Sequence, residues 1–152
     1  MLLGSINHVS VTVSDLPGAM KFFAPLLRFL GYEVGEVSHY APAETELVVN
    51  LNPRNELAFN IWQAKPRLRE HRFEVYEPGL HHVAFNVAEH SQIDELAELC
   101  VAWGGEILDG PGEFPFALGG YYALYVRGPD GLKLEFVHQP EIEQIYRERG
   151  IL

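Results

Sequence analysis

Three side chains of metal-binding type, His8, His82 and Glu135, stand at related places in this sequence. His82 follows His8 by 74 residues, and the segments around the two histidines are alike, so the chain contains an internal repeat. Two imidazoles and one carboxylate are the donor set of a facial metal site, which leaves positions open for substrate and suits Fe(II) and related divalent ions. A lone histidine in a strand is more often structural, so it is the repetition that favours a metal site.

The segments 6–13 and 80–87 alternate in a way that is typical of strands with one buried face. The faces opposite the apolar ones hold His8, Ser10 and Thr12 in the first copy and His82, Ala84 and Asn86 in the second. Because a sealed core would leave polar groups without partners, this pattern predicts an open pocket. His81 is one residue out of phase and is expected to point to the opposite face, so the repeat selects His82 as the candidate ligand.

Glu135 lies in an apolar stretch, 132–138, which aligns with residues 57–62 when the offset grows to 75. A carboxylate in a hydrophobic strand is costly unless it is paired or bound to a metal. The counterpart of Glu135 is Asn60, which could be a weak oxygen ligand, a hydrogen-bonding group behind the ligands, or a degenerate fourth position. Trp62 shares a face with Asn60 and is expected to line the pocket wall.

Each copy of the repeat predicts a strand, a helix and then about three strands, which is an α+β arrangement written twice. The first helix is expected to end at Gly31, and the second to begin at a Ser91 cap and to end at the equivalent Gly105. We expect one domain, made of module one at residues 4–64, a connector at 65–79, module two at 80–140 and a helical tail at 141–152.

Composition limits the classes of partner. The chain has 152 residues, of which 21 are acidic and 11 are basic, and this balance argues against a nucleic-acid or anionic-membrane surface. Cys100 is the only cysteine, which excludes an intramolecular disulfide and predicts a buried, inert thiol. No membrane span or leader segment is recognised, so we expect a soluble cytoplasmic protein without a membrane or nucleic-acid partner.

Two motifs carry a likeness to a known family. The first is Asn7-His8-Val9-Ser10-Val11 with its copy at residues 81–86, and the second is the run YVRGPDGLKLE at residues 125–135. Over about residues 4–139 the chain resembles the vicinal oxygen chelate superfamily, also called the glyoxalase, bleomycin-resistance and dioxygenase group. The resemblance implies two tandem βαβββ modules whose mixed sheets form a cup with helices on the outer face. It also implies a small-molecule substrate, a homodimer, and one divalent ion (Fe, Mn, Ni or Zn) held by His8, His82 and Glu135.

The resemblance does not select one reaction. Members similar to glyoxalase I carry a glutamate as fourth ligand where this chain has Asn60. Extradiol dioxygenases share the ligand set and a tyrosine ten residues before the glutamate, here Tyr125, but residues 116–120 lack a histidine that they also need. Fosfomycin-resistance transferases share the ligands and the tyrosine, with Ser10 at the place of a hydroxyl residue. Bleomycin-binding members are acidic, as this chain is, but lack the metal ligands.

We therefore predict a metal-dependent lyase or isomerase that chelates two neighbouring oxygens of a small oxygenated metabolite. A dioxygenase that uses Fe(II) and a non-catalytic small-molecule binding or resistance protein are the alternatives. Glu135 is predicted to be a ligand and candidate base, and Tyr125 to orient the substrate. By alternation Tyr121 shares the face of Tyr125 and Tyr122 takes the other, although all three could equally be packing residues. The predicted substrate-binding residues are Ser10, Asn60, Trp62 and Tyr121.

Overall fold

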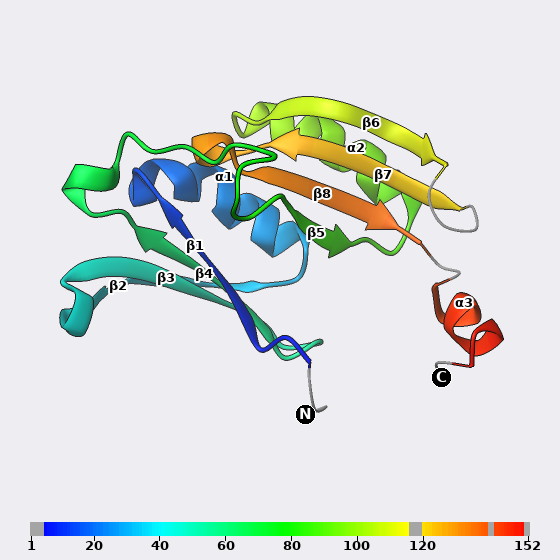
Figure 1. Ribbon diagram of the computed structural model, residues 1–152, viewed down its shortest axis with the longest axis horizontal. Helices are drawn as coiled ribbons and strands as arrows, with labels where there is room; N and C mark the ends of the chain where they lie inside the picture. The colour runs from blue at the N-terminus through cyan, green and yellow to red at the C-terminus, as the bar shows by residue number, and fades with distance from the viewer. Residues whose placement is uncertain (1–4, 116–119, 140–141, 151–152) are drawn as a thin grey trace. The chain divides into compact units, whose positions relative to one another are not determined.

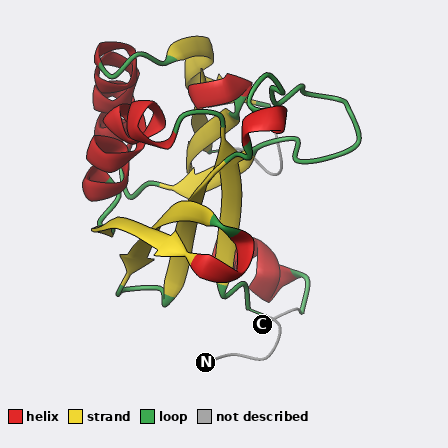
Figure 2. Ribbon diagram, turned by 90° about the vertical axis from the view of Figure 1, so that its left-hand side faces the viewer, coloured by secondary structure: helices red, strands yellow, loops and turns green. Residues whose placement is uncertain are grey.

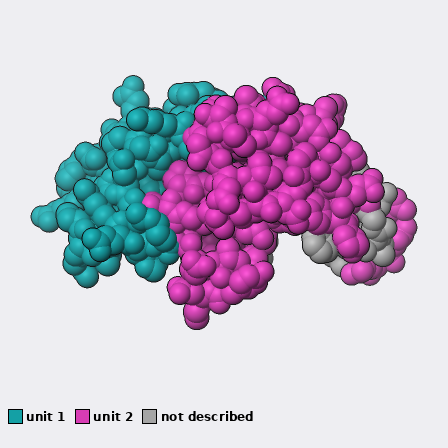
Figure 3. Space-filling view, turned by 90° about the horizontal axis from the view of Figure 1, so that it is seen from above, with its two compact units in different colours: residues 1–72 teal, residues 73–152 magenta. Residues whose placement is uncertain are grey.

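The computed structural model describes residues 5–115, 120–139 and 142–150. The chain divides into two compact units, residues 1–72 and residues 73–152, which Figure 3 shows in separate colours. Each unit contains one βαβββ module with its own sheet and its own core. Among the described residues, no helix is long and apolar enough to cross a lipid bilayer.

The first unit pairs helix α1 with a four-stranded mixed sheet in the order β1-β4-β3-β2 (Figure 1). β1 runs parallel to β4, and the other neighbouring strands are antiparallel. The elements are β1 His8–Val13, α1 Leu16–Phe29, β2 Glu33–Tyr40, β3 Thr45–Asn52 and β4 Leu57–Gln63, with short 3-10 turns at Ala41–Ala43 and Pro66–Leu68.

The second unit repeats this plan with helix α2 and a sheet in the order β5-β8-β7-β6, in which β5 and β8 are the parallel pair. The elements are β5 Val83–Asn86, α2 His90–Ala102, β6 Glu106–Phe114, β7 Tyr121–Arg127, a 3-10 turn at Pro129–Gly131, β8 Lys133–His138 and α3 Ile142–Glu148. The two modules confirm the predicted α+β class with a tandem βαβββ order.

Helix α1 covers one face of the first sheet, because its apolar residues recur at helical spacing (Figure 2). Phe23 of this helix packs against Phe59 of β4 with ring centroids 6.0 Å apart. On β1, Val11 and Val13 are buried, whereas the three polar positions of the strand are exposed. The predicted alternation of this strand is therefore confirmed.

Helix α2 covers one face of the second sheet and buries Ile93, Leu96 and Cys100. Beneath it Phe85 of β5 stacks on Phe136 of β8, with ring centroids 6.1 Å apart. Burial raises the pKa of the Cys100 thiol to about 12, so the thiol stays protonated at neutral pH. This confirms the prediction of a buried cysteine of low reactivity.

Helix α2 is capped by Glu89, and the prediction of a Ser91 cap was wrong. The Glu89 carboxylate accepts a hydrogen bond from the backbone N–H of Gln92, whose side chain accepts one from the Glu89 N–H at 3.2 Å. Ser91 lies inside the first turn, where its hydroxyl donates to Glu89 Oε2 at 3.3 Å. The reciprocal pair satisfies two free N–H groups at once, which outweighs the preference for serine at a cap.

Both helices end at a glycine in the left-handed conformation, but the equivalent of Gly31 is Gly104 and not the predicted Gly105. The backbone angle φ is +84° at Gly31 and +92° at Gly104. The N–H of the following residue, Tyr32 or Gly105, donates to the carbonyl five residues earlier. The equivalence moves by one residue because α2 has 13 residues and α1 has 14.

A glycine also interrupts the strand that follows each helix. β2 shifts its register against β3 around Gly35, and β6 shifts its register against β7 around Gly110. A methyl group at either glycine would collide with a backbone carbonyl of the neighbouring strand, that of Val49 or that of Ala123. Both sheets therefore need a residue without a side chain at this bulge.

Candidate metal and substrate site

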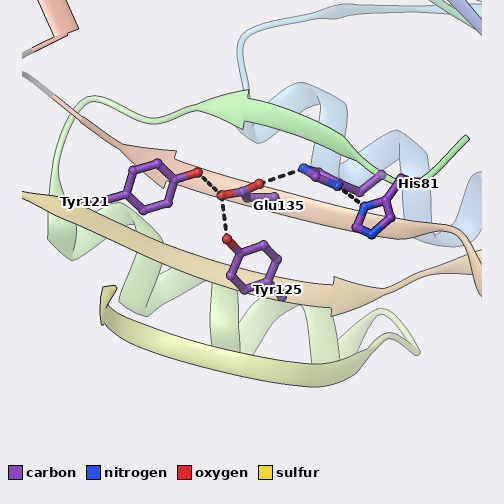
Figure 4. A network of polar contacts seen from close by, with 5 residues as sticks. His81, Tyr121, Tyr125 and Glu135 are labelled. Carbon is purple, nitrogen blue, oxygen red and sulfur yellow. Dashed lines mark hydrogen bonds and ion pairs between the residues drawn. The ribbon is translucent and has the colours of Figure 1, made fainter. Parts of the chain in front are cut away.

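The carboxylate of Glu135 is the centre of a polar network in the second unit (Figure 4). Glu135 lies on β8 and is 2% exposed. Its Oε1 accepts hydrogen bonds from the hydroxyls of Tyr121 and Tyr125, the latter at 2.9 Å. Its Oε2 lies 3.0 Å from Nε2 of His82. Both oxygens of this buried carboxylate are thus paired, which offsets the cost of removing the charge from water.

Strand register brings these side chains together. Tyr125 lies directly opposite Glu135 in the antiparallel pair β7–β8, and Tyr121 shares its face because it is four residues earlier on β7. In the parallel pair β5–β8 the residue opposite Glu135 is Ala84. Its small side chain leaves the carboxylate accessible to His82, which comes just before β5.

Tyr122 lies on the other face of β7, as alternation predicts. Its hydroxyl donates to Asp94 of α2 at 2.6 Å, and its ring stacks on His90 with centroids 4.1 Å apart. Tyr122 therefore belongs to the helix side of the sheet, away from Glu135.

Burial and the carboxylate together raise the pKa values of the two phenols beside Glu135. The pKa of Tyr121 is raised to about 12, first by burial and then by the hydrogen bond to Glu135 and its charge. The pKa of Tyr125 is also raised, first by burial, then by the hydrogen bond to Glu135 and its charge, and last by the neighbouring Tyr121. Both hydroxyls keep their protons at neutral pH, so they act as hydrogen-bond donors and not as bases.

His81 lies next to His82 at the site, contrary to the prediction that it points to the opposite face. The Nδ1 atoms of the two rings are 2.6 Å apart, and His81 lines the same pocket as Glu135. The alternation rule does not apply to these histidines because the strand begins only at Val83. The ring of His81 also contacts Tyr76 edge-on, with centroids 5.2 Å apart.

The network opens into a pocket of about 570 Å³ within the second unit. The residues around it are His81, His82, Leu108, Asp109, Phe114, Tyr121, Tyr125, Lys133 and Glu135. Apolar and aromatic walls with a few convergent polar groups are typical of sites for small organic molecules.

Several residues of this lining are not among the predicted site residues, although the sequence holds a readable signal for one of them, Lys133. Lys133 precedes Glu135 by two residues on β8, so alternation places the two on one face. Its Nζ lies 4.6 Å from the ring centroid of Tyr125. Asp109 and Phe114 come from β6, whose register shifts twice against β7, so no sequence period identifies them.

The first unit carries an amide where the second unit carries its carboxylate. Asn60 of β4 lies opposite Ser10 of β1, which is the register position that Glu135 and Ala84 occupy in the second unit. Asn60 Nδ2 donates to Ser10 Oγ at 3.3 Å. Asn60 Oδ1 is buried and has no hydrogen-bond partner among the described residues. This oxygen is a free acceptor beside a serine hydroxyl.

The other predicted residues of the first unit share the sheet face of Asn60. His8 is exposed at the start of β1, with Nδ1 2.8 Å from Asn7 Oδ1. Trp62 is half-buried and contacts Tyr40 edge-on, with centroids 5.4 Å apart. The first unit thus groups His8, Ser10, Asn60 and Trp62 on one face, and the second unit brings together His82, Tyr121, Tyr125 and Glu135.

The repeated module and its site place the chain in a family. The sequence model of the Glyoxalase/Bleomycin resistance protein/Dioxygenase superfamily matches residues 5–136. The chain belongs to this superfamily. The resemblance seen in the two sequence motifs is thereby confirmed.

Known proteins align with this chain over most of its length. The uncharacterized protein YqjT of Bacillus subtilis (strain 168) is 29% identical over 133 residues, which are 87% of this chain and 97% of YqjT. A glyoxalase-type protein of Bacillus halodurans has a TM-score of 0.71 and 27% identity, covering 90% of this chain and 97% of its own. The fosfomycin resistance protein FosX of Listeria monocytogenes, solved as a mutant with Mn(II), has a TM-score of 0.61 and 19% identity, covering 95% and 98%. The likeness to FosX shows the fold alone.

Superfamily members often bind a divalent metal, and the donors of the second unit fit part of such a site. His82 Nε2 and Glu135 Oε2 face each other, so both donors are directed at the same point. The phenols on Oε1 supply the outer hydrogen bonds that support a ligating carboxylate. No group of three or more His, Cys, Asp or Glu side chains that could hold a metal is found among the described residues. The third ligand, His8, stays a prediction from the sequence repeat.

Proposed function

We propose that this superfamily member is a divalent-metal-dependent enzyme, a lyase or isomerase, that acts on a small oxygenated metabolite. The observation that carries the proposal is the buried Glu135, whose Oε1 is held by two phenols while its Oε2 meets an imidazole. A carboxylate arranged in this way is pre-organised as an anionic ligand and is difficult to explain as a packing residue. The proposed ligands are Glu135, His82 and, on the strength of the repeat alone, His8.

The roles of the residues follow from what each can donate or accept. A bound divalent ion would act as a Lewis acid on two neighbouring substrate oxygens. Tyr121 and Tyr125 hold the carboxylate in place by donating to it, so Tyr125 can also orient a substrate hydroxyl by accepting a hydrogen bond from it at the phenolic oxygen. Glu135 is the proposed acceptor for a substrate proton. Phe114, whose ring lies 5.2 Å from that of Tyr125, adds an apolar wall that restricts water.

Three residues of the first unit complete the proposal as substrate contacts. Asn60 offers the acceptor that has no partner among the described residues, and Ser10 is hydrogen-bonded to its amide. Trp62 offers an aromatic surface on the same sheet face. We also propose a homodimer, for which the mass of the particle in solution is the direct measurement.

Metal content tests the proposal. The protein, reconstituted anaerobically with Fe(II), Mn(II), Ni(II) or Zn(II), is compared with the double variant His82→Ala, Glu135→Ala by elemental mass spectrometry. We expect about one equivalent per chain in the parent and loss of the metal in the double variant. A matched control is His39→Ala, Glu46→Ala, which removes an exposed histidine and acid that lie opposite each other on β2 and β3. Absence of metal in the reconstituted parent would leave a non-catalytic binding protein as the better account.

Oxygen consumption separates the two kinds of enzyme. The iron-loaded protein is tested with catechols in an oxygen electrode, beside the zinc-loaded and nickel-loaded forms. A lyase or isomerase consumes no oxygen with any metal. Uptake that depends on Fe(II) and on Glu135 would instead identify a dioxygenase.

A further inference from the structure

We propose that the substrate of the second-unit pocket carries a carboxylate-type anionic group and that Lys133 binds this group. The inference rests on the proposed function, because it names the substrate class of the same site. It concerns the charge, the position and the partners of one lysine that is not among the proposed metal ligands.

The first observation is the position of Lys133. It lies two residues before Glu135 on β8, and both side chains line the same pocket. The lysine is half-buried, and its Nζ lies 4.6 Å from the centre of the Tyr125 ring. Because the Tyr125 hydroxyl is fixed to Glu135 at 2.9 Å, the ring holds the ammonium group at a defined distance along the pocket from the carboxylate.

The second observation is that the two neighbouring cations of this sheet, Arg127 and Lys133, differ in their ion pairing. Arg127 lies directly opposite Lys133 in the β7–β8 register, and it pairs with Glu106 at 2.6 Å. Lys133 forms no ion pair with any carboxylate of the described residues, although the chain has 21 acidic residues against 11 basic ones. Besides Glu135, the acidic side chain of the lining is Asp109, which accepts a hydrogen bond from Gly110 N at 2.9 Å.

These observations favour an anionic ligand over a role in packing. A partly buried ammonium group without a counter-ion costs free energy, and an arriving anion would remove that cost. The π-face of Tyr125 attracts the ammonium group but does not neutralise it. Lysine presents a compact point charge with three donors, which suits a single carboxylate or phosphate group. The substrate would therefore present its neighbouring oxygens toward Glu135 and its anionic group toward Lys133.

Glycerate and glycerol are suitable probes, because they share a three-carbon chain with neighbouring hydroxyls and differ by the carboxylate. Their dissociation constants are measured by NMR titration on the metal-loaded protein and on the metal-free protein. We expect glycerate to bind the parent at least about tenfold more tightly than glycerol, and this preference to weaken as the salt concentration rises. Equal affinity for the two probes overturns the proposal.

Substitutions then assign the preference to one side chain. Lys133→Met keeps an aliphatic stem on the Tyr125 ring, so we expect a melting temperature no lower than that of the parent and the same glycerol affinity, with loss of the tenfold preference. Lys133→Arg retains the charge and should retain most of the preference. The control is Arg127→Met, which removes the opposite cation but leaves the pocket lining unchanged. An equal loss in Arg127→Met, or no loss in Lys133→Met, overturns the proposal.

The same data separate this inference from the proposed function. If the parent binds no metal but keeps a glycerate preference that depends on Lys133, the enzyme proposal fails and the anion site stands. If metal is bound through Glu135 and glycerate shows no advantage over glycerol, the enzyme proposal stands and the anion site fails.

Discussion

The two units use one scaffold and differ in what they place on it. In both, a parallel pair of strands brings a late-strand residue opposite an early-strand residue: Glu135 opposite Ala84, and Asn60 opposite Ser10. The antiparallel neighbour of Glu135 is Tyr125, whose hydroxyl completes the carboxylate's hydrogen bonds.

In the first unit the antiparallel neighbour of Asn60 is Val49, which has no polar group to offer. The result is a complete network around a charge in one unit and a buried amide oxygen without a partner among the described residues in the other. The βαβββ fold is therefore maintained independently of the site, which depends on a few side chains that the strands carry.

The largest expected effect is on metal affinity, and it distinguishes the carboxylate of Glu135 from the amide of Asn60. Glu135→Gln should weaken metal binding by more than about 100-fold, because it removes the anionic donor while keeping its volume. Asn60→Ala, the equivalent position, should change the metal affinity by less than about threefold. Isothermal titration of the metal-free protein with Mn(II) or Zn(II) measures both. Similar losses in the two variants would show that the units contribute equally.

The next effect concerns stability and the two equivalent glycines, Gly35 and Gly110, at the bulges of the two sheets. Gly35→Ala should lower the free energy of unfolding by about 1 kcal/mol, because its methyl group meets the carbonyl of Val49. Gly110→Ala should lower it by about 2 kcal/mol, since the positive φ of Gly110 adds strain to a similar collision. Urea unfolding measures the difference. Gly112→Ala is the control, because a methyl group there meets nothing within 4 Å.

A smaller effect is expected from the phenol of Tyr125, which lies opposite Glu135 where the first unit has Val49 opposite Asn60. Tyr125→Phe removes one hydrogen bond to Oε1 of Glu135, and we expect it to reduce metal affinity about tenfold. Tyr122→Phe removes a hydroxyl from the same strand, but on the helix side, where it bonds to Asp94. That variant should bind metal as the parent does. A loss of affinity in Tyr122→Phe would mean that the sheet as a whole, and not the hydroxyl on Oε1, sets the affinity.

The smallest effect is a dependence of stability on alkaline pH in the metal-free protein. The pKa of Tyr121 rises from 10.0 in its ordinary state to about 12 in the folded protein. Between these values the unfolded chain binds fewer protons than the folded chain, so the free energy of unfolding falls as pH rises above 10. Tyr121→Phe should flatten this decline, and absorbance of the phenolate at alkaline pH should show one fewer late-titrating tyrosine. An unchanged slope in the variant would contradict the raised pKa.

Much of the fold could be predicted because strand alternation and repetition act within regular elements. They gave the two modules, the buried valines of the first strand, and the opposite faces of Tyr121 and Tyr122. The same rule failed for His81, since residues before Val83 have left the strand. The repeat also predicted Gly105 as the equivalent of Gly31 at the helix end, where the structure has Gly104. No pattern in the sequence reveals that the second helix is one residue shorter.

The pocket was less predictable than the carboxylate at its centre. Glu135 stood out because a charge in an apolar strand is rare. Alternation also places Lys133 on the face of Glu135, but its residue type does not mark it, since lysine at a strand end is usually a solvated residue. Asp109 and Phe114 depend on the bulges of β6, which change the side chain that each position presents.

If Glu135 ligates a divalent ion as proposed, the two hydroxyls on Oε1 would also set its denticity. The lone pairs of Oε1 already accept from Tyr121 and Tyr125, so Oε2, which faces His82, would be the oxygen that ligates. A carboxylate limited to one oxygen occupies one vertex of an octahedral ion where a chelating carboxylate would occupy two. With such an ion bound, the tyrosines would leave one more coordination position for an incoming molecule, although neither of them needs to touch it.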